Sequence, residues 1–152
     1  MVASKKERPS LDTYFMNVAK VIATRSTCRR HDVGAIAVRD KYILSTGYNG
    51  APAGLQDCLE LGCLRDAESI PSGERTEICR AVHAEENVII QAALHGTSLT
   101  NATIYCTHSP CRRCAKMLIN AHIAELVYDN EYADDYYAGL FGEAEILCRR
   151  LK

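Results

Sequence analysis

The chain has 152 residues, with 18 basic and 19 acidic side chains and a formal charge of −1. This balance gives no electrostatic reason to expect nucleic acid or an anionic membrane as a partner, and we expect neither. The length suffices for one domain whose core needs no disulfide bonds. No stretch approaches the ~20 apolar residues of a membrane-spanning helix, and the N-terminal residues lack a signal peptide, so we expect a cytoplasmic protein.

The first elements expected are a helix and a hairpin. Residues 1–9 are charged and are predicted to form a loose tail. Ser10 can cap a helix that continues to about residue 26, because apolar residues recur three and four positions apart. Two short apolar runs around a polar turn then predict an antiparallel hairpin, with strands over 33–38 and 42–46.

A long aperiodic segment, residues 49–82, follows the hairpin. A loop of this length inside a compact domain is usually functional or held in place by something. Beyond it, the pattern predicts helices over 83–94, 111–121 and 134–140 and strands over 103–106, 126–128 and 146–151. Strands separated by helices pair most easily in parallel, so the order predicts a single α/β sandwich in one domain spanning residues 1–152.

Two short motifs carry the chemistry. His83 and Glu85 supply an imidazole and a carboxylate, and Pro110 precedes two thiols three residues apart, Cys111 and Cys114. One histidine and two cysteines provide three ligands for a tetrahedral zinc ion and leave its fourth position to water. Glu85 can serve as general acid and base on that water. The pattern H-x-E…P-C-x-x-C is the signature of zinc-dependent nucleobase deaminases, so we predict hydrolytic deamination with one catalytic zinc per chain.

A structural zinc site with four protein ligands is the alternative for a lone C-x-x-C pair. The carboxylate two residues after His83 favours catalysis, because a structural site needs no acid. Glu86 is the competing carboxylate and is expected to be a solvated helix position. Among the other histidines, His108 is the one expected to be able to line the pocket, whereas residues such as His31 are expected on the surface or in the core.

These motifs, with Val33-Gly34-Ala35 and Gly47-Tyr48-Asn49-Gly50, resemble the cytidine deaminase superfamily and, within it, the deoxycytidylate (dCMP) deaminases, including the bacterial competence-operon type. The resemblance covers roughly residues 10–151 and implies a three-layer α/β/α sandwich around a central mixed five-stranded sheet. It implies conversion of dCMP to dUMP, which feeds thymidylate synthesis. It also implies a homo-oligomer, commonly a hexamer, that dCTP activates and dTTP inhibits in many members, with Mg²⁺ entering only with a triphosphate effector.

The resemblance also implies roles for single residues. Asn49 would hold the sugar, and the candidates for substrate contact as a whole are Asn49, Ser26, Arg29, Ala84 and Tyr132. Ser26, Arg29 and Tyr132 belong to the phosphate region, whereas Tyr48 and Gly50 belong to an effector-sensitive loop. Three alternatives stay open: Arg29 as a solvated cation, Asn49-Gly50 as a favoured turn pair, and Tyr132 as the cap of a strand end.

Four cysteines lie in or beside the aperiodic segment: Cys28, Cys58, Cys63 and Cys79. Some deoxycytidylate deaminases carry a second, structural zinc in this region, with a ligand near the position of Cys28. The hypothesis is therefore a closed four-thiolate site that holds the segment against the core. The alternative is a set of buried or free thiols. Cys106 and Cys148 lie in apolar strand patterns and are expected to be inert core thiols.

Two other functions are weighed against dCMP deamination. The first keeps the chemistry but changes the substrate to a tRNA adenosine, cytosine, cytidine or a riboflavin precursor. The Gly47–Gly50 stretch and the lack of a basic excess argue against it. The second is a catalytically silent zinc scaffold, against which Glu85 argues.

Overall fold

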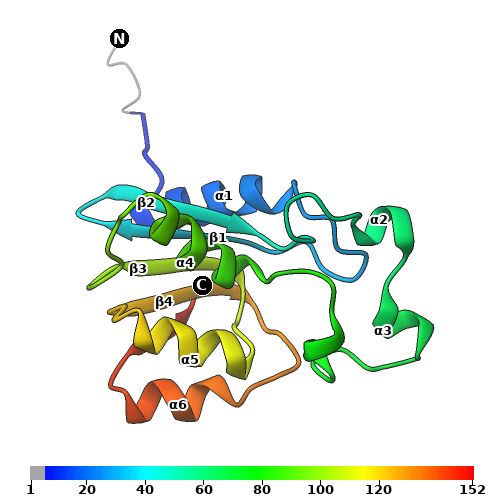
Figure 1. Cartoon of the computed structure of the whole chain (residues 1–152). Coiled ribbons are helices and arrows are strands. Elements are labelled where there is room, and N and C mark those ends of the chain that lie inside the picture. The colour runs from blue at the N-terminus through cyan, green and yellow to red at the C-terminus, as the bar shows by residue number, and fades with distance from the viewer. Residues whose placement is uncertain (1–5) are drawn as a thin grey trace.

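The computed structural model describes residues 6–152 and is built around one five-stranded sheet (Figure 1). Its strands are β1 (Gly34–Arg39), β2 (Tyr42–Tyr48), β3 (Thr103–His108), β4 (Glu125–Asn130) and β5 (Leu147–Arg150). Their spatial order is β2-β1-β3-β4-β5. β1 is antiparallel to both of its neighbours, whereas β3, β4 and β5 pair in parallel. The predicted mixed five-stranded sheet is therefore confirmed.

The hairpin of β1 and β2 forms as predicted. Asp40 and Lys41 have φ values of 52° and 67°, which is the backbone conformation that a two-residue hairpin turn favours. β1 is almost wholly buried and lies between β2 and β3, whereas the half-exposed β2 lies at the sheet edge. β2 and β3, which a helix connects, therefore run parallel without pairing, because β1 lies between them.

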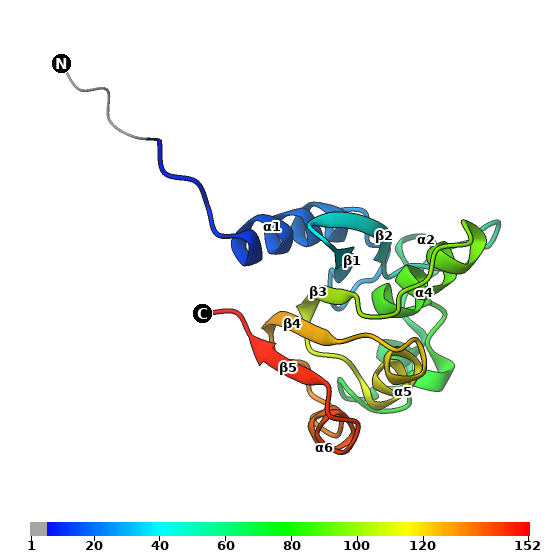
Figure 2. The same ribbon diagram turned by 90° about the vertical axis from the view of Figure 1, so that its left-hand side faces the viewer.

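Helices cover both faces of this sheet and complete three layers (Figure 2). α1 (Leu11–Ala23) lies on one face, and α4 (Ala84–Leu94), α5 (Arg112–Asn120) and α6 (Tyr137–Glu143) lie on the other. Side chains along each strand point to alternate faces. On β1, Ile36 belongs to the core beside α1, whereas Ala35 and Ala37 belong to the core beneath α4. The predicted three-layer α/β/α sandwich is confirmed.

Two glycines of the sequence motifs bring the layers close together. A Cβ atom on Gly34 would lie 2.1 Å from the backbone oxygen of Ala19 in α1. A Cβ atom on Gly47 would lie 2.3 Å from the backbone oxygen of Ala84, at the start of α4. Only glycine permits these approaches without movement of the backbone, so Gly47 lets the edge strand contact the N-terminus of α4, where the motif residues lie.

The aperiodic segment 49–82 contains three short helical turns that the pattern does not predict. These are α2 (Cys58–Leu61), α3 (Leu64–Ala67) and the 3-10 turn η1 (Thr76–Ile78), and they extend to one side of the sheet (Figure 1). The two ends of the segment meet, because the backbones of Gly50 and Val82 exchange hydrogen bonds of 3.1 and 2.8 Å. The segment is therefore an insertion with a closed neck, and it is called the insertion below.

Most other boundaries shift by a few residues from those predicted. α1 ends at Ala23 rather than near residue 26, and α6 begins at Tyr137 rather than at Asp134. The carboxylate of Asp134 accepts hydrogen bonds from the backbone of Arg112 and Tyr136, which fixes this stretch before the helix begins. Of the predicted tail, residues 6–9 are exposed and irregular, and residues 1–5 lie outside the described residues. Between residues 6 and 152, no helix is both long and apolar enough to cross a membrane.

Candidate active site

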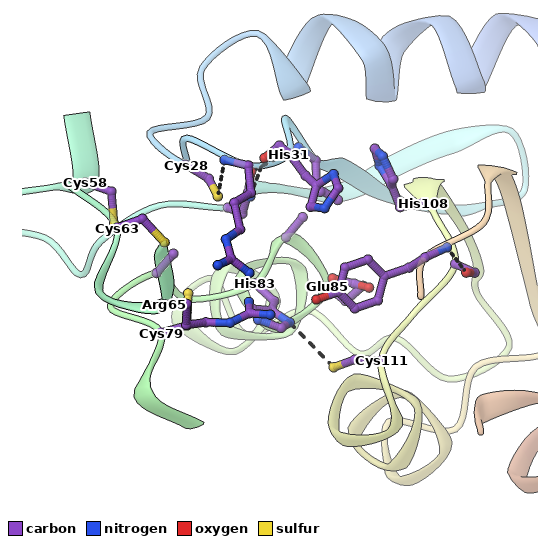
Figure 3. Close-up of a pocket in the computed structure, with 17 residues that line it drawn as sticks. Cys28, His31, Cys58, Cys63, Arg65, Cys79, His83, Glu85, His108 and Cys111 are labelled. Carbon is purple, nitrogen blue, oxygen red and sulfur yellow. Dashed lines mark hydrogen bonds between the residues drawn. The ribbon is translucent and has the colours of Figure 1, made fainter. Parts of the chain in front are cut away.

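Two helix N-termini bring the three predicted ligands together. His83 is the N-cap of α4, Cys111 is the N-cap of α5, and Cys114 lies in the first turn of α5. The Sγ atoms of Cys111 and Cys114 lie 3.5 and 3.4 Å from Nδ1 of His83. Figure 3 shows the contact between Cys111 and His83. Among the residues that the structure describes, this is the only group of three or more His, Cys, Asp or Glu ligand atoms within 4.8 Å of one another.

This donor set fits a zinc ion. Tetrahedral coordination at the usual Zn–S and Zn–N lengths separates a sulfur from a nitrogen ligand by about 3.5 Å, which agrees with the observed spacing. A hydrogen bond to Cys114 and contacts with His83 lower the pKa of Cys111 to about 4, against the opposing effect of burial. Burial alone would lower the pKa of His83, but hydrogen bonds to Cys111 and Cys79 raise it to about 11. Cys111 can therefore bind a metal ion as a thiolate, and the metal cation can take the place of the imidazole proton of His83.

Glu85 is the buried carboxylate of the site. It is 4% exposed, and it lies beside the cluster without belonging to it. Burial raises the pKa of Glu85 to about 7, although the nearby positive charge of His83 opposes this shift. A carboxyl group with a pKa near neutrality can both accept and return a proton at physiological pH. Glu85 therefore fits the predicted role of general acid and base.

Glu86 is not the solvated helix position that the sequence suggested. Its side chain accepts a hydrogen bond of 2.8 Å from the backbone N–H of His83, and this contact caps the N-terminus of α4. Its other oxygen lies 2.8 Å from Nε of Arg113 on α5. Glu86 therefore positions the backbone of His83 and faces away from the reaction, because adjacent helical residues point in different directions.

A cavity opens beside this cluster, with a volume of about 650 Å³ that includes the space at its mouth. The predicted residues that line it are His83, Ala84, Glu85, Cys111, Asn49, Tyr132 and His108. Its lining also includes His31, which was expected on the surface or in the core, and Arg30 and Arg65, which the sequence did not single out. No local pattern marks them, because the first two lie in an irregular loop and Arg65 lies in the insertion.

Known proteins are similar to this chain in sequence. Residues 9–130 match the family model described as the cytidine and deoxycytidylate deaminase zinc-binding region. The chain belongs to the cytidine and deoxycytidylate deaminase family. Within this deaminase family, the chain is 37% identical over 144 residues to a deoxycytidylate deaminase of Schizosaccharomyces pombe, an alignment that covers 94% of the chain and 44% of the yeast protein. It is 38% identical over 147 residues to ComE operon protein 2 of Bacillus subtilis, covering 96% of the chain and 74% of that protein.

A solved deaminase structure has the same fold. The crystal structure of dCMP deaminase from the cyanophage S-TIM5 in complex with dCMP and dUMP superimposes with a TM-score of 0.80 at 28% identity. The superposition covers 96% of the present chain and all of the phage chain. The predicted cytidine deaminase-like fold is confirmed. The chain spans less than half the length of the two yeast deoxycytidylate deaminases that it matches.

The remaining substrate candidates of this deaminase-family chain lie in different places. Asn49 lines the cavity, and its side-chain amide forms two hydrogen bonds to the backbone. Its Oδ1 accepts from the N–H of Val33 at 3.0 Å, and its Nδ2 donates to the backbone oxygen of His31 at 2.8 Å. Ser26 makes similar local contacts within its loop and does not line the cavity. Arg29 is exposed and lines a neighbouring groove. 

The two residues of the predicted effector loop also lie outside the cavity lining. Gly50 belongs to the neck of the insertion, and Tyr48 is half-exposed at the end of β2. Nothing in their contacts identifies a ligand, so the effector role stays a prediction.

The four cysteines of the hypothetical second zinc site, Cys28, Cys58, Cys63 and Cys79, line one side of the same cavity (Figure 3). Burial raises the pKa of Cys58, and the other three thiols raise it further, which places the four groups near one another. No three of their sulfur atoms lie within 4.8 Å of one another, so they form a looser group than the first cluster. Cys106 and Cys148 pack in the core as expected, and burial raises the pKa of both.

Proposed function

We propose that the chain is a zinc-dependent deaminase that hydrolyses dCMP to dUMP and releases ammonia. The observation that carries this proposal is the buried carboxylate of Glu85, which lines the cavity beside the His83, Cys111 and Cys114 cluster. The relation to the named deoxycytidylate deaminases supports the choice of substrate. The phage relative, whose structure contains dCMP and dUMP, supports it further.

Glu85 moves the protons of the reaction. A zinc ion held by His83, Cys111 and Cys114 would supply Lewis acidity that makes a water molecule a strong nucleophile near neutral pH. Glu85 accepts a proton from the attacking water while the water oxygen adds to C4 of the cytosine ring. Glu85 then gives this proton to ring nitrogen N3. Glu85 then takes the remaining proton from the hydroxyl on C4 and passes it to the amino group, the C4–N4 bond breaks, and ammonia leaves, so that dCMP and water give dUMP and ammonia.

Substrate contacts follow from the cavity lining. We assign the sugar to Asn49, whose two backbone contacts hold it rigidly, and the region around the base to Ala84 at the start of α4. Tyr132 also faces the cavity and fits the phosphate region. Ser26 and Arg29 stay predictions for that region, because neither lines the cavity.

The proposal includes the wider properties that the family resemblance implies. These are one deaminase domain, a cytoplasmic location, supply of dUMP for thymidylate synthesis and a homo-oligomer such as a hexamer. Regulation by dCTP and dTTP, with Mg²⁺ bound to the triphosphate, would act through Tyr48 and Gly50. Large apolar side chains exposed on α1 support a subunit contact, namely Leu11, Tyr14 and Val21.

The proposal also keeps the second, structural zinc at Cys28, Cys58, Cys63 and Cys79. The four thiols come from the loop before β1 and from three parts of the insertion, so one ion would tie the insertion to the core. Protein purified without a chelator should then contain two zinc ions per chain by elemental analysis. One ion per chain would remove the second site.

An ammonia-release assay tests the function against its main alternative. Wild-type protein is offered cytosine, deoxycytidine and dCMP at equal concentrations, with and without dCTP and dTTP. The proposal predicts that dCMP is the preferred substrate. A preference for cytosine or deoxycytidine would keep the chemistry but overturn the nucleotide as the substrate.

A further inference from the structure

Arg65 is a buried cation without an acidic partner. It lies in α3 of the insertion and is 5% exposed, and arginine is rarely buried to this extent unless it is paired. Its Nη2 donates to the backbone oxygen of Pro71 at 3.1 Å, whereas its Nε is buried and has no hydrogen-bond partner. Across residues 6–152, no carboxylate forms an ion pair with it. Its Nε donor is therefore free for a ligand.

The neighbouring Arg30 shows the contrast. Its Nε lies 2.7 Å from Oδ1 of Asp66, and its Nη2 donates to the backbone oxygen of Ile70 at 2.6 Å. Both arginines line the cavity, yet Arg30 is neutralised within the protein and already ties the insertion to the loop before β1. Arg65 is therefore not needed as a second ionic anchor for the same segment.

The side of the cavity that contains Arg65 favours an anion. Glu85 is the one carboxylate in the described lining, and it lies beside the metal ligands His83 and Cys111 rather than beside Arg65 in the insertion. Burial lowers the pKa of His31, and the positive charges of Arg30 and Arg65 lower it further. A guanidinium group binds a phosphate through two parallel hydrogen bonds, which suits the unpaired Nε of Arg65.

We propose that Arg65 binds the phosphate of the nucleotide substrate and so selects the monophosphate over the nucleoside. This inference rests on the proposed function and adds a specificity-determining residue to it. The sequence-based expectation placed the phosphate near Ser26, Arg29 and Tyr132, of which Tyr132 alone lines the cavity, and Arg65 adds a cation to that region. Nε of Arg65 gains its partner when the nucleotide enters, and the phosphate then fixes the position of the ring beside Glu85.

Substitution of Arg65 by glutamine tests the proposal. In Arg65→Gln, kcat/KM for dCMP should fall about 10–100-fold, mainly through KM, because a charge-assisted pair of hydrogen bonds is lost. The value for deoxycytidine should change by less than about threefold, since this substrate has no phosphate. Arg75→Gln is the matched control, because Arg75 is an exposed arginine of the same insertion that pairs with Glu77. It should leave both values unchanged.

Binding of the product provides a readout that does not depend on turnover. We expect dUMP to raise the melting temperature of the wild-type protein more than deoxyuridine does at the same concentration. In Arg65→Gln, the shift with dUMP should shrink to the shift with deoxyuridine. The free variant should melt only slightly below wild type, because the substitution removes the hydrogen bond to the backbone oxygen of Pro71 but no ion pair with a carboxylate. Should the glutamine variant not fold, Arg65→Lys keeps the charge without the planar fork and should lose part of the selectivity.

The outcomes separate this proposal from the proposed function. If wild type prefers dCMP and the Arg65 variants keep that preference, Arg65 does not bind the phosphate. The same conclusion follows if the variants lose zinc but keep the preference, because Arg65 would then serve the nearby thiol of Cys79. If wild type itself shows no preference for dCMP, the proposed function fails and the assignment of Arg65 fails with it.

Discussion

Two neighbouring glutamates at the start of α4 have different roles. Glu85 points into the cavity beside the metal ligands, where burial raises its pKa to about 7. Glu86, one residue later, points about 100° away around the helix and caps the backbone of His83. The sequence identifies the first carboxylate by its spacing from the histidine. It cannot show the role of the second, because that role depends on Arg113 in another helix.

A prediction at this scale concerns the proton carrier. Glu85→Gln keeps the shape of the side chain but removes its ability to accept a proton, so turnover of dCMP should fall by about 10²–10⁴-fold. Zinc content should match wild type, because Glu85 is not one of the clustered ligands. Ammonia release and elemental analysis on the same samples measure both quantities. Activity within tenfold of wild type would show that another group carries the proton.

At the scale of elements, an ionic network ties the first helix to three strands. The carboxylate of Asp12 in α1 accepts hydrogen bonds from Arg149 of β5 at 2.7 and 3.0 Å and from the hydroxyl of Tyr105 in β3 at 2.8 Å. Arg149 also pairs with Glu125 of β4. Hydrogen bonds from Arg149 lower the pKa of Asp12 below its ordinary value of 3.8, although burial acts against them. The network therefore holds α1 to the sheet in the ionised state.

This network predicts a pH-dependent part of the stability. Because the pKa of Asp12 is lower in the folded than in the unfolded chain, its contribution is complete above the unfolded pKa and is lost as the pH falls through the folded value. Asp12→Asn should cost about 1 kcal/mol at pH 7, which corresponds to roughly 2–4 °C in Tm. Thermal melts of wild type and variant at pH 7 and pH 3 measure the difference. A gap that stays the same at both pH values would exclude the ionised carboxylate as the cause.

Local patterns predicted most elements, and tertiary contacts account for the differences. The α1 cap, the hairpin and the alternating helices and strands all follow from periodicity and turn residues. The α6 boundary differs because Asp134 bonds to Arg112, a contact that spans 22 residues. The turns α2 and α3 are four residues long, which is too short to show a helical period.

At the scale of the whole molecule, the cavity depends on segments that lie far apart in the chain. The insertion supplies Arg65 and three cysteines, the loop before β1 supplies Arg30, and two helix N-termini supply the metal ligands. The spacing of His83, Glu85, Cys111 and Cys114 predicts the catalytic cluster, because each pair lies at the start of one helix. No comparable spacing in the sequence predicts the cations of the cavity, because Arg65 reaches the cavity wall only when the insertion is folded.

The most direct measurement of the central claim is dCMP deamination before and after zinc removal. Protein dialysed against a chelator should lose its ammonia release together with its zinc, and added Zn²⁺ should restore both. The Cys114→Ser variant lacks one of the three ligands. After the same incubation with Zn²⁺, it should contain less zinc than wild type and show little turnover. Full turnover of dCMP by chain that contains no zinc would contradict the account, as would zinc-replete wild type that releases no ammonia from dCMP.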